Sequence, residues 1–371
     1  MSSFKASDLS ANGIASGAHS LGSKTAQTTR FWVVLIVAFA LAYIVQPYPV
    51  VAAWFGFAFA GYSAIANDSI QTLGTFIASN KNKPWWQLWL WIGGIFLLTM
   101  TYSWAVFDGD VSHQRLASKG FDKSPESFHY LQLCAPLFLL ILTRLKIPVS
   151  TTFLLLSCFA ASSKGILAVT TKSLTGYAIA FACSIALWGA FSPWMAKKFT
   201  GTAHPAWRVA QWATTGLLWS IWLQQDAANI AVFLPRQLSI FEFIIFASFI
   251  FAGLGVLFRM GGEKIQEIVD EKSSVVDVRA ATVIDFIYAI ILYVFKISSN
   301  IPMSTTWVFV GLLGGREIAM AFRRANEQGR NTKQALLLAG RDVGFVTIGF
   351  IISLAIASIV NPAVAEGLFG K

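Results

Sequence analysis

The chain has 371 residues, of which 56% are hydrophobic and only 12% are charged. Soluble domains carry about 25% charged residues, so this composition excludes an ordinary soluble domain and indicates a helical protein that crosses a lipid bilayer many times. The formal net charge of +10 could suggest nucleic acid. However, Lys and Arg cluster in short loops between apolar runs, as cytoplasmic loops do, and no nucleic-acid partner is expected.

The N-terminal region divides into a polar tail and an apolar run. Residues 1–30 are rich in Ser, Ala and Gly, which predicts a disordered cytoplasmic tail. Phe31–Val45 is wholly apolar, and residues 31–49 are expected to form an extra N-terminal transmembrane helix. A signal sequence is the alternative, but its polar lead is long and no clear cleavage site follows.

Ten further apolar segments follow, which gives about 11 transmembrane segments in an all-α membrane protein. They are Val50–Ser79, Gln87–Phe107, Tyr130–Leu142, 147–170, Thr175–Ala196, Val209–Leu234, Leu238–Phe258, Thr282–Phe295, 301–322 and Val343–Val360. Residues 50–200 and 201–371 are read as two halves. The second half carries charged loops at 259–281 and 323–341.

The distribution of Lys and Arg sets the orientation. With the N-terminus inside, the basic loops near residues 81–83, 144–146, 197–208, 259–281 and 323–341 all fall inside. The largest outside loop, 108–128, balances its basic residues with acidic ones. This agreement with the positive-inside rule predicts a multi-pass protein of the plasma (inner) membrane, with its C-terminus outside.

Two similar motifs are the candidates for anion binding. Ile147-Pro148-Val149 precedes Ser150, Thr151 and Thr152, and Ile301-Pro302-Met303 precedes Ser304, Thr305 and Thr306. Pro, Ser and Thr are typical of helix starts, where free backbone N–H groups and the helix dipole attract anions. Ser and Thr are also common packing residues between membrane helices, so one copy alone would carry little weight.

Two aspartates in apolar segments are the candidates for cation and substrate binding. A carboxylate in hydrocarbon costs about 2.5–3.5 kcal/mol even on the most lenient scale, so it is seldom without a role. Asp68 shares one helix face with Gln71 and Thr75 and follows Asn67; Asp226 follows Gln225 and shares a face with Asn229. Oxygen ligands of this kind suit Na⁺. The alternative is that each Asp only bonds a neighbouring helix.

The two sets of motifs are spaced alike. Asp68 lies 82 residues before Ser150, and Asp226 lies 78 residues before Ser304. In the predicted topology the corresponding segments cross the membrane in opposite directions. This pattern is typical of an inverted-topology repeat with broken helices, in which substrate binds near the midplane between the repeats.

The same residues resemble the inorganic phosphate transporter (PiT) family of cation-coupled phosphate permeases, which also contains sulfate permeases. The likeness covers roughly residues 50–322 and rests on three motifs. These are Ile65-Ala66-Asn67-Asp68, Gln224-Gln225-Asp226-Ala227-Ala228-Asn229, and Gly261-Gly262-Glu263-Lys264 followed by Ile301 to Thr306. The resemblance implies an inverted-repeat fold, a homodimer in many members, and phosphate symport with Na⁺ or H⁺. It also implies that the aspartates hold cation and substrate, and that the Ser-Thr-Thr starts hold the anion.

Three departures from the family pattern concern the substrate. The His that follows Ser-Thr-Thr is Phe153 in one copy and Trp307 in the other; Gln225 stands in place of Asn; and Val232 stands where the first half has Gly74. Sulfate or another small oxyanion therefore stays an alternative substrate. An anion channel or a non-transporting receptor is the alternative of another class.

An enzyme is not expected. Ser/His, His/Glu and Cys/His groups do not share a segment, and the four histidines are scattered through the tail and loops. The three cysteines lie in apolar segments, with no metal-ligand spacing. No cofactor is predicted beyond Na⁺ or H⁺ as the coupling ion.

Overall fold

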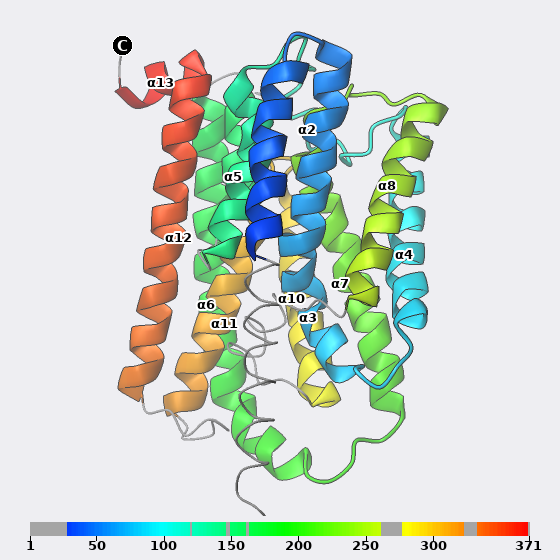
Figure 1. Cartoon of the computed structure of the whole chain (residues 1–371). Helices are drawn as coiled ribbons and strands as arrows, with labels where there is room; N and C mark the ends of the chain where they lie inside the picture. The colour runs from blue at the N-terminus through cyan, green and yellow to red at the C-terminus, as the bar shows by residue number, and fades with distance from the viewer. Residues whose placement is uncertain are drawn as a thin grey trace, which may run out of the picture.

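The computed structural model describes residues 28–118, 121–145, 149–160, 163–260, 277–322 and 332–369, and within these ranges it contains helices and no strands (Figure 1). Most of the predicted tail, residues 261–276 of the first predicted charged loop and residues 323–331 of the second lie outside the described residues. So do Ile147 and Pro148. The rest of the second predicted loop, residues 332–341, is helical and not a loop. An all-α fold is therefore confirmed for the part of the chain that the structure describes.

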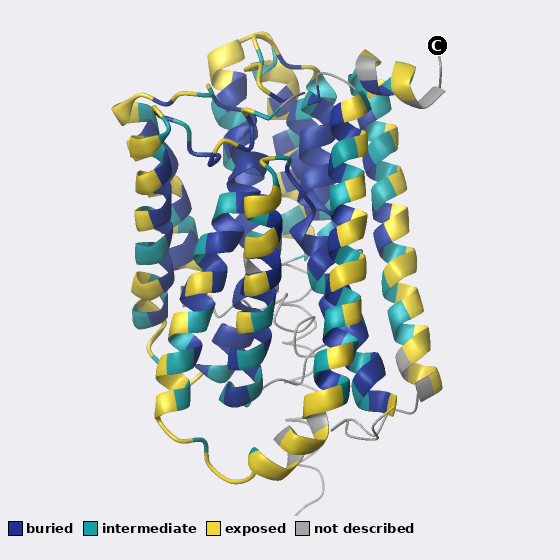
Figure 2. Ribbon diagram, turned by 180° about the vertical axis from the view of Figure 1, so that it is seen from behind, coloured by how far each residue is buried: buried dark blue, intermediate teal, exposed yellow. Residues whose placement is uncertain are grey.

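Seven of the described helices are long and apolar enough to cross a membrane. They are Thr28–Val45, Pro49–Ala66, Trp85–Val106, Ser163–Phe191, Ile240–Arg259, Val278–Ser298 and Leu336–Val360. Their outer faces carry exposed large hydrophobic side chains such as Leu98, Phe241 and Ile359, which are 70–76% exposed. Figure 2 shows exposed residues along the outer faces and buried ones inside. Apolar surface on this scale is suited to contact with lipid.

The first half begins with a helix that changes its winding. α2 (Pro49–Ser63) continues through a π-helical turn at Ala64–Asp68 into α3 (Ser69–Ser79), and α4 (Trp85–Val106) returns alongside α8. A π turn widens one helical turn by a residue and is frequent at functional sites. The predicted single segment 50–79 is thus one path with a local distortion, placed at Asp68.

The predicted segment 147–170 is not a single helix. A π turn at Thr152–Leu156 and a short 3₁₀ turn at Ser157–Phe159 end at Ala160, whose backbone is extended. α6 (Ser163–Lys198) then runs for 36 residues and joins the end of this segment to the next predicted one. The sequence explains the course of this helix. Ser162 and Ser163 favour a helix start, and no Pro breaks the helix between residues 170 and 175, where the prediction placed a boundary.

α5 (Tyr130–Arg144) and residues 149–160 form a hairpin. Near the start of α5, the Gln132 side chain donates a hydrogen bond to the Cys158 carbonyl, 2.8 Å away. The Ala160 carbonyl accepts one from Asn361, beyond the end of α12. The chain therefore returns to the end of the molecule where α5 began. Arg144 lies near the inner turn of this hairpin, whereas the sequence predicted a loop at the cytoplasmic end.

A second hairpin reaches in from the opposite end. It consists of α10 (Val278–Ser298) and α11 (Thr305–Phe322), both of which extend to the lower end of the molecule in Figure 1. The Tyr288 hydroxyl, halfway along α10, donates to the Thr305 carbonyl at 3.0 Å. The two Ser-Thr-Thr segments thus lie at the inner turns of two hairpins.

The remaining helices are α7 (Ala206–Ala231), α8 (Ile240–Arg259), α12 (Thr332–Val360) and α13 (Pro362–Phe369). Eleven crossings are not confirmed. Four predicted segments have no counterpart among the seven candidate spans: three lie in the hairpins (130–142, 147–170 and 301–322), and the fourth is α7. Each hairpin enters the helix bundle and leaves it at the same end, so it replaces two opposite crossings. The predicted directions of the other helices are therefore unaffected.

Helix α11 is held against α6 by close packing at glycine. A Cβ at Gly311 would lie 2.6 Å from the Tyr177 carbonyl oxygen, and the Ser184 hydroxyl of α6 donates to the Leu312 carbonyl at 2.6 Å. Small residues at such positions let helix backbones approach each other in membranes.

We expect Gly311→Ala to lower the free energy of unfolding by about 1–3 kcal/mol, because the added methyl group must push the two helices apart. Gly344→Ala on α12 is the matched control: a Cβ there meets nothing within 4 Å, and Ala is about 1 kcal/mol better than Gly in a helix. Thermal unfolding of purified protein in detergent measures both. Equal melting temperatures for Gly311→Ala and the unmodified chain would contradict this packing.

Candidate functional site

The two predicted aspartates are brought together. Asp68 ends the π turn between α2 and α3, and Asp226 lies on α7; their exposed fractions are only 2% and 4%. The two carboxyl groups are close enough to interact electrostatically. Two like charges in a buried site repel each other, so the pair needs a cation, a proton or hydrogen-bond donors nearby.

The two Ser-Thr-Thr segments meet at Asp226. The hydroxyls of Thr152 and Thr305, one from each segment, interact with the Asp226 carboxyl group. Thr152 also donates a hydrogen bond to the Met303 carbonyl at 3.2 Å, so the two segments touch directly. The six Ser and Thr residues that were predicted to bind substrate are all buried, as are the two aspartates; the six are Ser150, Thr151, Thr152, Ser304, Thr305 and Thr306.

The two serines act as caps in the same way. The Ser150 hydroxyl accepts from the Phe153 backbone N–H at 3.3 Å, and the Ser304 hydroxyl accepts from the Trp307 N–H at 3.2 Å. These contacts confirm the predicted capping role. The Ser304 N–H itself donates to the Ser173 hydroxyl of α6 at 2.8 Å.

Three oxygens on α7 have no hydrogen-bond donor among the described residues. They are Oε1 of Gln225, Oδ2 of Asp226 and Oδ1 of Asn229, and all are buried. The other ends of these groups are held: Asn229 donates to Asp226 Oδ1 at 2.7 Å, and Gln225 donates to the Leu292 carbonyl at 3.3 Å. A buried acceptor without a donor is costly, and hard oxygens of this kind are what Na⁺ binds.

The other predicted cation ligands lie elsewhere or outside the described side chains. The side chains of Asn67 and Gln71 are not among those that the structure describes. The Thr75 hydroxyl donates to Asp285 Oδ1 at 2.8 Å, two helical turns along α3 from Asp68. Thr75 thus belongs to a second polar cluster.

Asp285 is the site residue that the sequence reading missed. It lies on α10 with 1% of its surface exposed, and it also accepts a hydrogen bond from the Thr215 hydroxyl of α7 at 2.5 Å. Asp285 therefore joins α3, α7 and α10. The signal was present, since it is the only charged residue in the predicted segment Thr282–Phe295 and carries the same burial cost as the other two aspartates.

A further network continues from Thr75 toward the end of α3. Asn80 donates to Gln211 Oε1 at 2.9 Å and accepts from the Trp212 indole at 3.1 Å, and Gln211 also donates to Ser79. Polar contacts thus follow α3 and α7 from the paired aspartates to one end of the molecule.

Aromatic rings occupy the two positions that directly follow the Ser-Thr-Thr segments. The rings of Phe153 and Trp307 are 5.0 Å apart, and both contact Phe350 of α12 at 4.7 and 5.5 Å. The site therefore has an apolar wall behind the Ser-Thr-Thr segments, and no imidazole titrates there.

Two cations hold the second hairpin. Arg115, from the 108–128 loop, is 1% exposed and donates to the carbonyls of Gln224 and Ser299 at 3.1 and 2.6 Å. Lys172 of α6 donates to the Ser299 and Ile301 carbonyls at 3.0 and 2.8 Å. The burial of Arg115 lowers its pKa to about 10, so it stays charged at neutral pH. The sequence reading placed the whole loop outside and did not anticipate a buried Arg.

The loop that supplies Arg115 is strained. Asp108, His113 and Gln114 have φ angles of 50–62°, a left-handed conformation that costs a residue other than Gly of order 1 kcal/mol or more. Ser103 and Asp110 anchor this turn: Ser103 accepts from the His113 N–H at 3.1 Å, and Asp110 accepts from the Ser112 and Gln114 N–H groups. The strained turn thus positions Arg115 to bind the carbonyls of Gln224 and Ser299.

We expect Lys172→Met to lower the free energy of unfolding by about 2 kcal/mol, because the Met side chain keeps the apolar stem but leaves the Ile301 carbonyl without its donor. Lys164→Met is the control, since Lys164 lies two turns away on the same helix with an exposed side chain. Thermal unfolding in detergent compares them. An equal, small effect of both substitutions would show that Lys172 does not hold the hairpin.

His113 should make the fold acid-sensitive. Burial, with Lys296 and Arg115 nearby, lowers the pKa of His113 from 6.5 to about 3. Between these values the unfolded chain binds a proton that the folded chain does not, so stability falls as pH falls below 6.5. The loss at pH 5 is about 2 kcal/mol.

His113→Asn tests this, because Asn does not titrate and tolerates the left-handed conformation. Melting temperatures at pH 7.5 and pH 5 should differ less in this variant than in the unmodified chain. His204→Asn, at an exposed position, should leave the difference unchanged. The same acid-induced drop in the His113 variant would refute the assignment.

Comparison with known proteins gives no relative to set beside this geometry: no family model, no curated protein and no solved structure matches the chain.

Proposed function

We propose that the protein is a secondary active transporter that imports a small oxyanion, inorganic phosphate first, by symport with a cation. One observation carries the proposal: the two Ser-Thr-Thr segments touch, through the Thr152 hydroxyl and the Met303 carbonyl, beside the buried Asp226. Hydroxyls and helix starts suit the oxygens of an anion, and buried carboxylates suit a cation. The resemblance to the inorganic phosphate transporter family supports the same assignment.

The helices are assigned to an inverted-topology repeat. The path α2–α3, α4, the α5 hairpin and α6 corresponds to α7, α8, the α10–α11 hairpin and α12, and corresponding elements run in opposite directions in Figure 1. Both copies use the Ser cap in the same way, and the two equivalent residues Phe153 and Trp307 are in contact. An inverted repeat with two broken segments at its centre is an arrangement found in many transporters that work by alternating access.

Charge balance supplies the coupling. The empty site holds Asp68 and Asp226, which repel an anion. A cation bound to Gln225, Asp226 and Asn229 neutralises part of this charge and lets the anion approach the Ser-Thr-Thr segments. Because neither substrate binds well alone, the two move together. The loaded site then closes to one side of the membrane and opens to the other as the two hairpins shift against the remaining helices.

Na⁺ is preferred over H⁺ as the coupling ion. Three oxygen acceptors without donors lie within two helical turns of α7, which suits a metal cation with several oxygen ligands. A proton needs only one of them. The aromatic cluster at Phe153 and Trp307 also lacks a titratable group that would favour proton coupling.

Sulfate is the closest alternative substrate, and the aromatic cluster is the observation that favours it. Sulfate carries no proton at neutral pH and needs only donors, whereas phosphate is partly protonated and also needs an acceptor. Replacing both His residues by Phe153 and Trp307 removes two groups that can accept. The burial of all six Ser and Thr side chains fits a carrier with a closed site better than a channel.

The orientation proposed places the protein in the plasma (inner) membrane with the N-terminus inside and the C-terminus outside. The connection after α3, which carries Lys81 and Lys83, and the end of α6, which carries Lys197 and Lys198, both lie at the lower end in Figure 1. α13 lies at the upper end. This matches the rule that basic loops stay inside. A homodimer is the oligomeric state suggested by the family resemblance.

We expect Asp226→Asn and Asp68→Asn each to lower Na⁺-driven phosphate uptake at least 100-fold, because the amide keeps the shape but cannot neutralise a cation. Uptake of radiolabelled phosphate into proteoliposomes, with and without an inward Na⁺ gradient, measures this. Asp122→Asn in the outer loop is the control, since its side chain is exposed.

Competition with excess sulfate separates the two substrates. Uptake that sulfate leaves unchanged supports phosphate, and uptake that sulfate abolishes moves the assignment to sulfate. Full activity in both Asp68 and Asp226 variants would refute the site. Flux that exceeds any saturable rate and ignores the Na⁺ gradient would indicate a channel.

A further inference from the structure

Two neighbouring tryptophans of α7 differ in one respect. The rings of Trp219 and Trp222 are stacked, 5.0 Å apart and within 8° of parallel, and both side chains are at least 96% buried. The Trp219 indole nitrogen donates to the Ile92 carbonyl at 3.1 Å. The Trp222 indole nitrogen is also buried, but it has no acceptor among the described residues. The two rings thus share one environment, and only one has its hydrogen bond.

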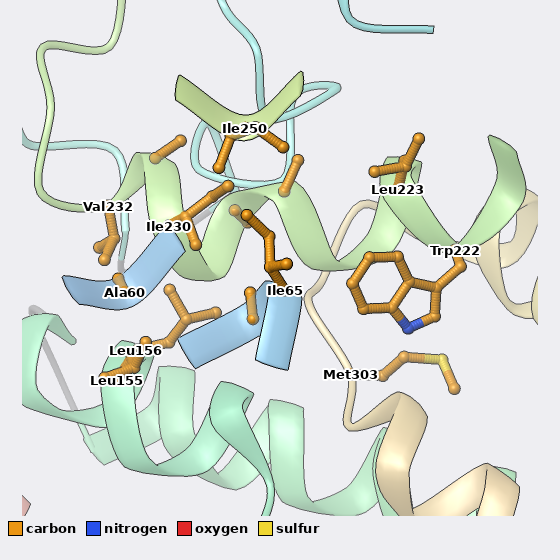
Figure 3. Close-up of a cluster of buried hydrophobic side chains, with 14 of the residues drawn as sticks. Ala60, Ile65, Leu155, Leu156, Trp222, Leu223, Ile230, Val232, Ile250 and Met303 are labelled. Atoms are coloured by element: carbon orange, nitrogen blue, oxygen red, sulfur yellow. The ribbon is translucent and has the colours of Figure 1, made fainter. Parts of the chain in front are cut away.

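Trp222 lies at the proposed site. It precedes Asp226 by one helical turn on α7, and both side chains line the same small, mainly apolar cavity, together with Trp219 and with Ile65 from the π turn. In Figure 3 its nitrogen faces Met303, the residue before Ser304. The Met303 carbonyl already accepts from Thr152. The indole N–H therefore faces the place where the two Ser-Thr-Thr segments meet.

An indole N–H can only donate a hydrogen bond, so a cation cannot satisfy it. Leaving it unpaired in a buried site costs about 1–3 kcal/mol, which α7 could avoid with Phe at this position. The Thr151 hydroxyl, from the first Ser-Thr-Thr segment, is a second buried donor without a partner among the described residues. The empty site thus holds donors without acceptors as well as the acceptors of α7.

We propose that the Trp222 indole N–H donates to an oxygen of the transported oxyanion and is a specificity-determining residue. This inference rests on the proposed function and adds to it. The acceptors of Gln225, Asp226 and Asn229 take the cation, and Trp222 and Thr151 take the anion. Because a charged oxygen accepts a stronger hydrogen bond than a protonated one, the position favours an unprotonated oxygen of the substrate.

Trp222→Phe tests the hydrogen bond, because Phe keeps a flat apolar ring and removes only the donor and part of the ring area. Trp219→Phe is the matched control. Phosphate and sulfate uptake into proteoliposomes gives KM for each anion, and Na⁺ titration at saturating anion gives the Na⁺ requirement. Thermal unfolding, with and without 10-fold excess of each anion over its KM (about 1.4 kcal/mol of ligand stabilisation), gives an independent readout of binding.

We expect Trp222→Phe to raise the KM of the transported anion about tenfold or more, as for a lost hydrogen bond to a charged ligand, with the Na⁺ requirement unchanged. Its melting temperature without anion should stay near that of the unmodified chain, because no protein hydrogen bond is lost, and the stabilisation by anion should disappear. Trp219→Phe should do the opposite: it should lower the melting temperature and leave KM unchanged.

The inference fails if the unmodified protein transports an anion and Trp222→Phe transports it with the same KM. It also fails if Trp222→Phe lowers the melting temperature as much as Trp219→Phe and leaves anion stabilisation intact, since the ring would then have a packing role only. Anion stabilisation that depends on Trp222, without Na⁺-driven uptake, would support the inference and refute the transporter. Neither uptake nor stabilisation by either anion would overturn both.

Discussion

A broken helix inside a membrane leaves backbone groups without partners, and this constraint shapes the centre of the protein. No water is available there to satisfy them, so the surrounding protein must do so. Around the second break, Arg115 and Lys172 bind the carbonyls at 299–301, and Ser173 accepts from the Ser304 N–H. At the contact between the hairpins, Thr152 satisfies the Met303 carbonyl. Each break is stable only because a residue distant in the sequence completes it, so the outer loop, α6 and both hairpins form one mechanical unit.

The need for partners also divides the buried polar groups into two kinds: those that the protein itself satisfies, and those that the described residues leave without a hydrogen-bond partner. Asp285 has two threonine donors, and Arg115 and Lys172 have their carbonyls, so these buried groups are satisfied by the protein itself. Oε1 of Gln225, Oδ2 of Asp226 and Oδ1 of Asn229, and the donors of Trp222 and Thr151, are not satisfied by the described residues. They lie on α7 and on the hairpin segment beside it. The unsatisfied groups therefore mark the region that a cation and an anion would complete.

The sequence was sufficient for features that depend on local chemistry. Apolar length predicted the long helices, the burial cost of charge selected Asp68 and Asp226, and the capping preference of Ser predicted the role of Ser150 and Ser304. It was insufficient where distant contacts decide. A run of apolar residues at 147–170 is as consistent with a span as with a hairpin arm, and only the contact from Gln132 to Cys158 distinguishes them. Arg115 was read as a solvated loop charge because its carbonyl partners lie more than 100 residues away in the chain. Thr75 was grouped with Asp68 from helical spacing, but Asp285, from another helix, provides its partner.

The two aromatic residues Phe153 and Trp307 are best understood as one unit. Although 154 positions apart in the sequence, the two rings are in direct contact, and Phe350 packs against both. A single His among these rings would be buried without a polar partner, which disfavours its charged form and leaves a ring nitrogen unsatisfied. Two His residues could instead bind each other or a shared ligand. The positions therefore favour two polar or two apolar residues over one of each. This chain has the apolar pair; in the proposed transporter, the hydroxyls, Trp222 and the carboxylates would therefore recognise the substrate.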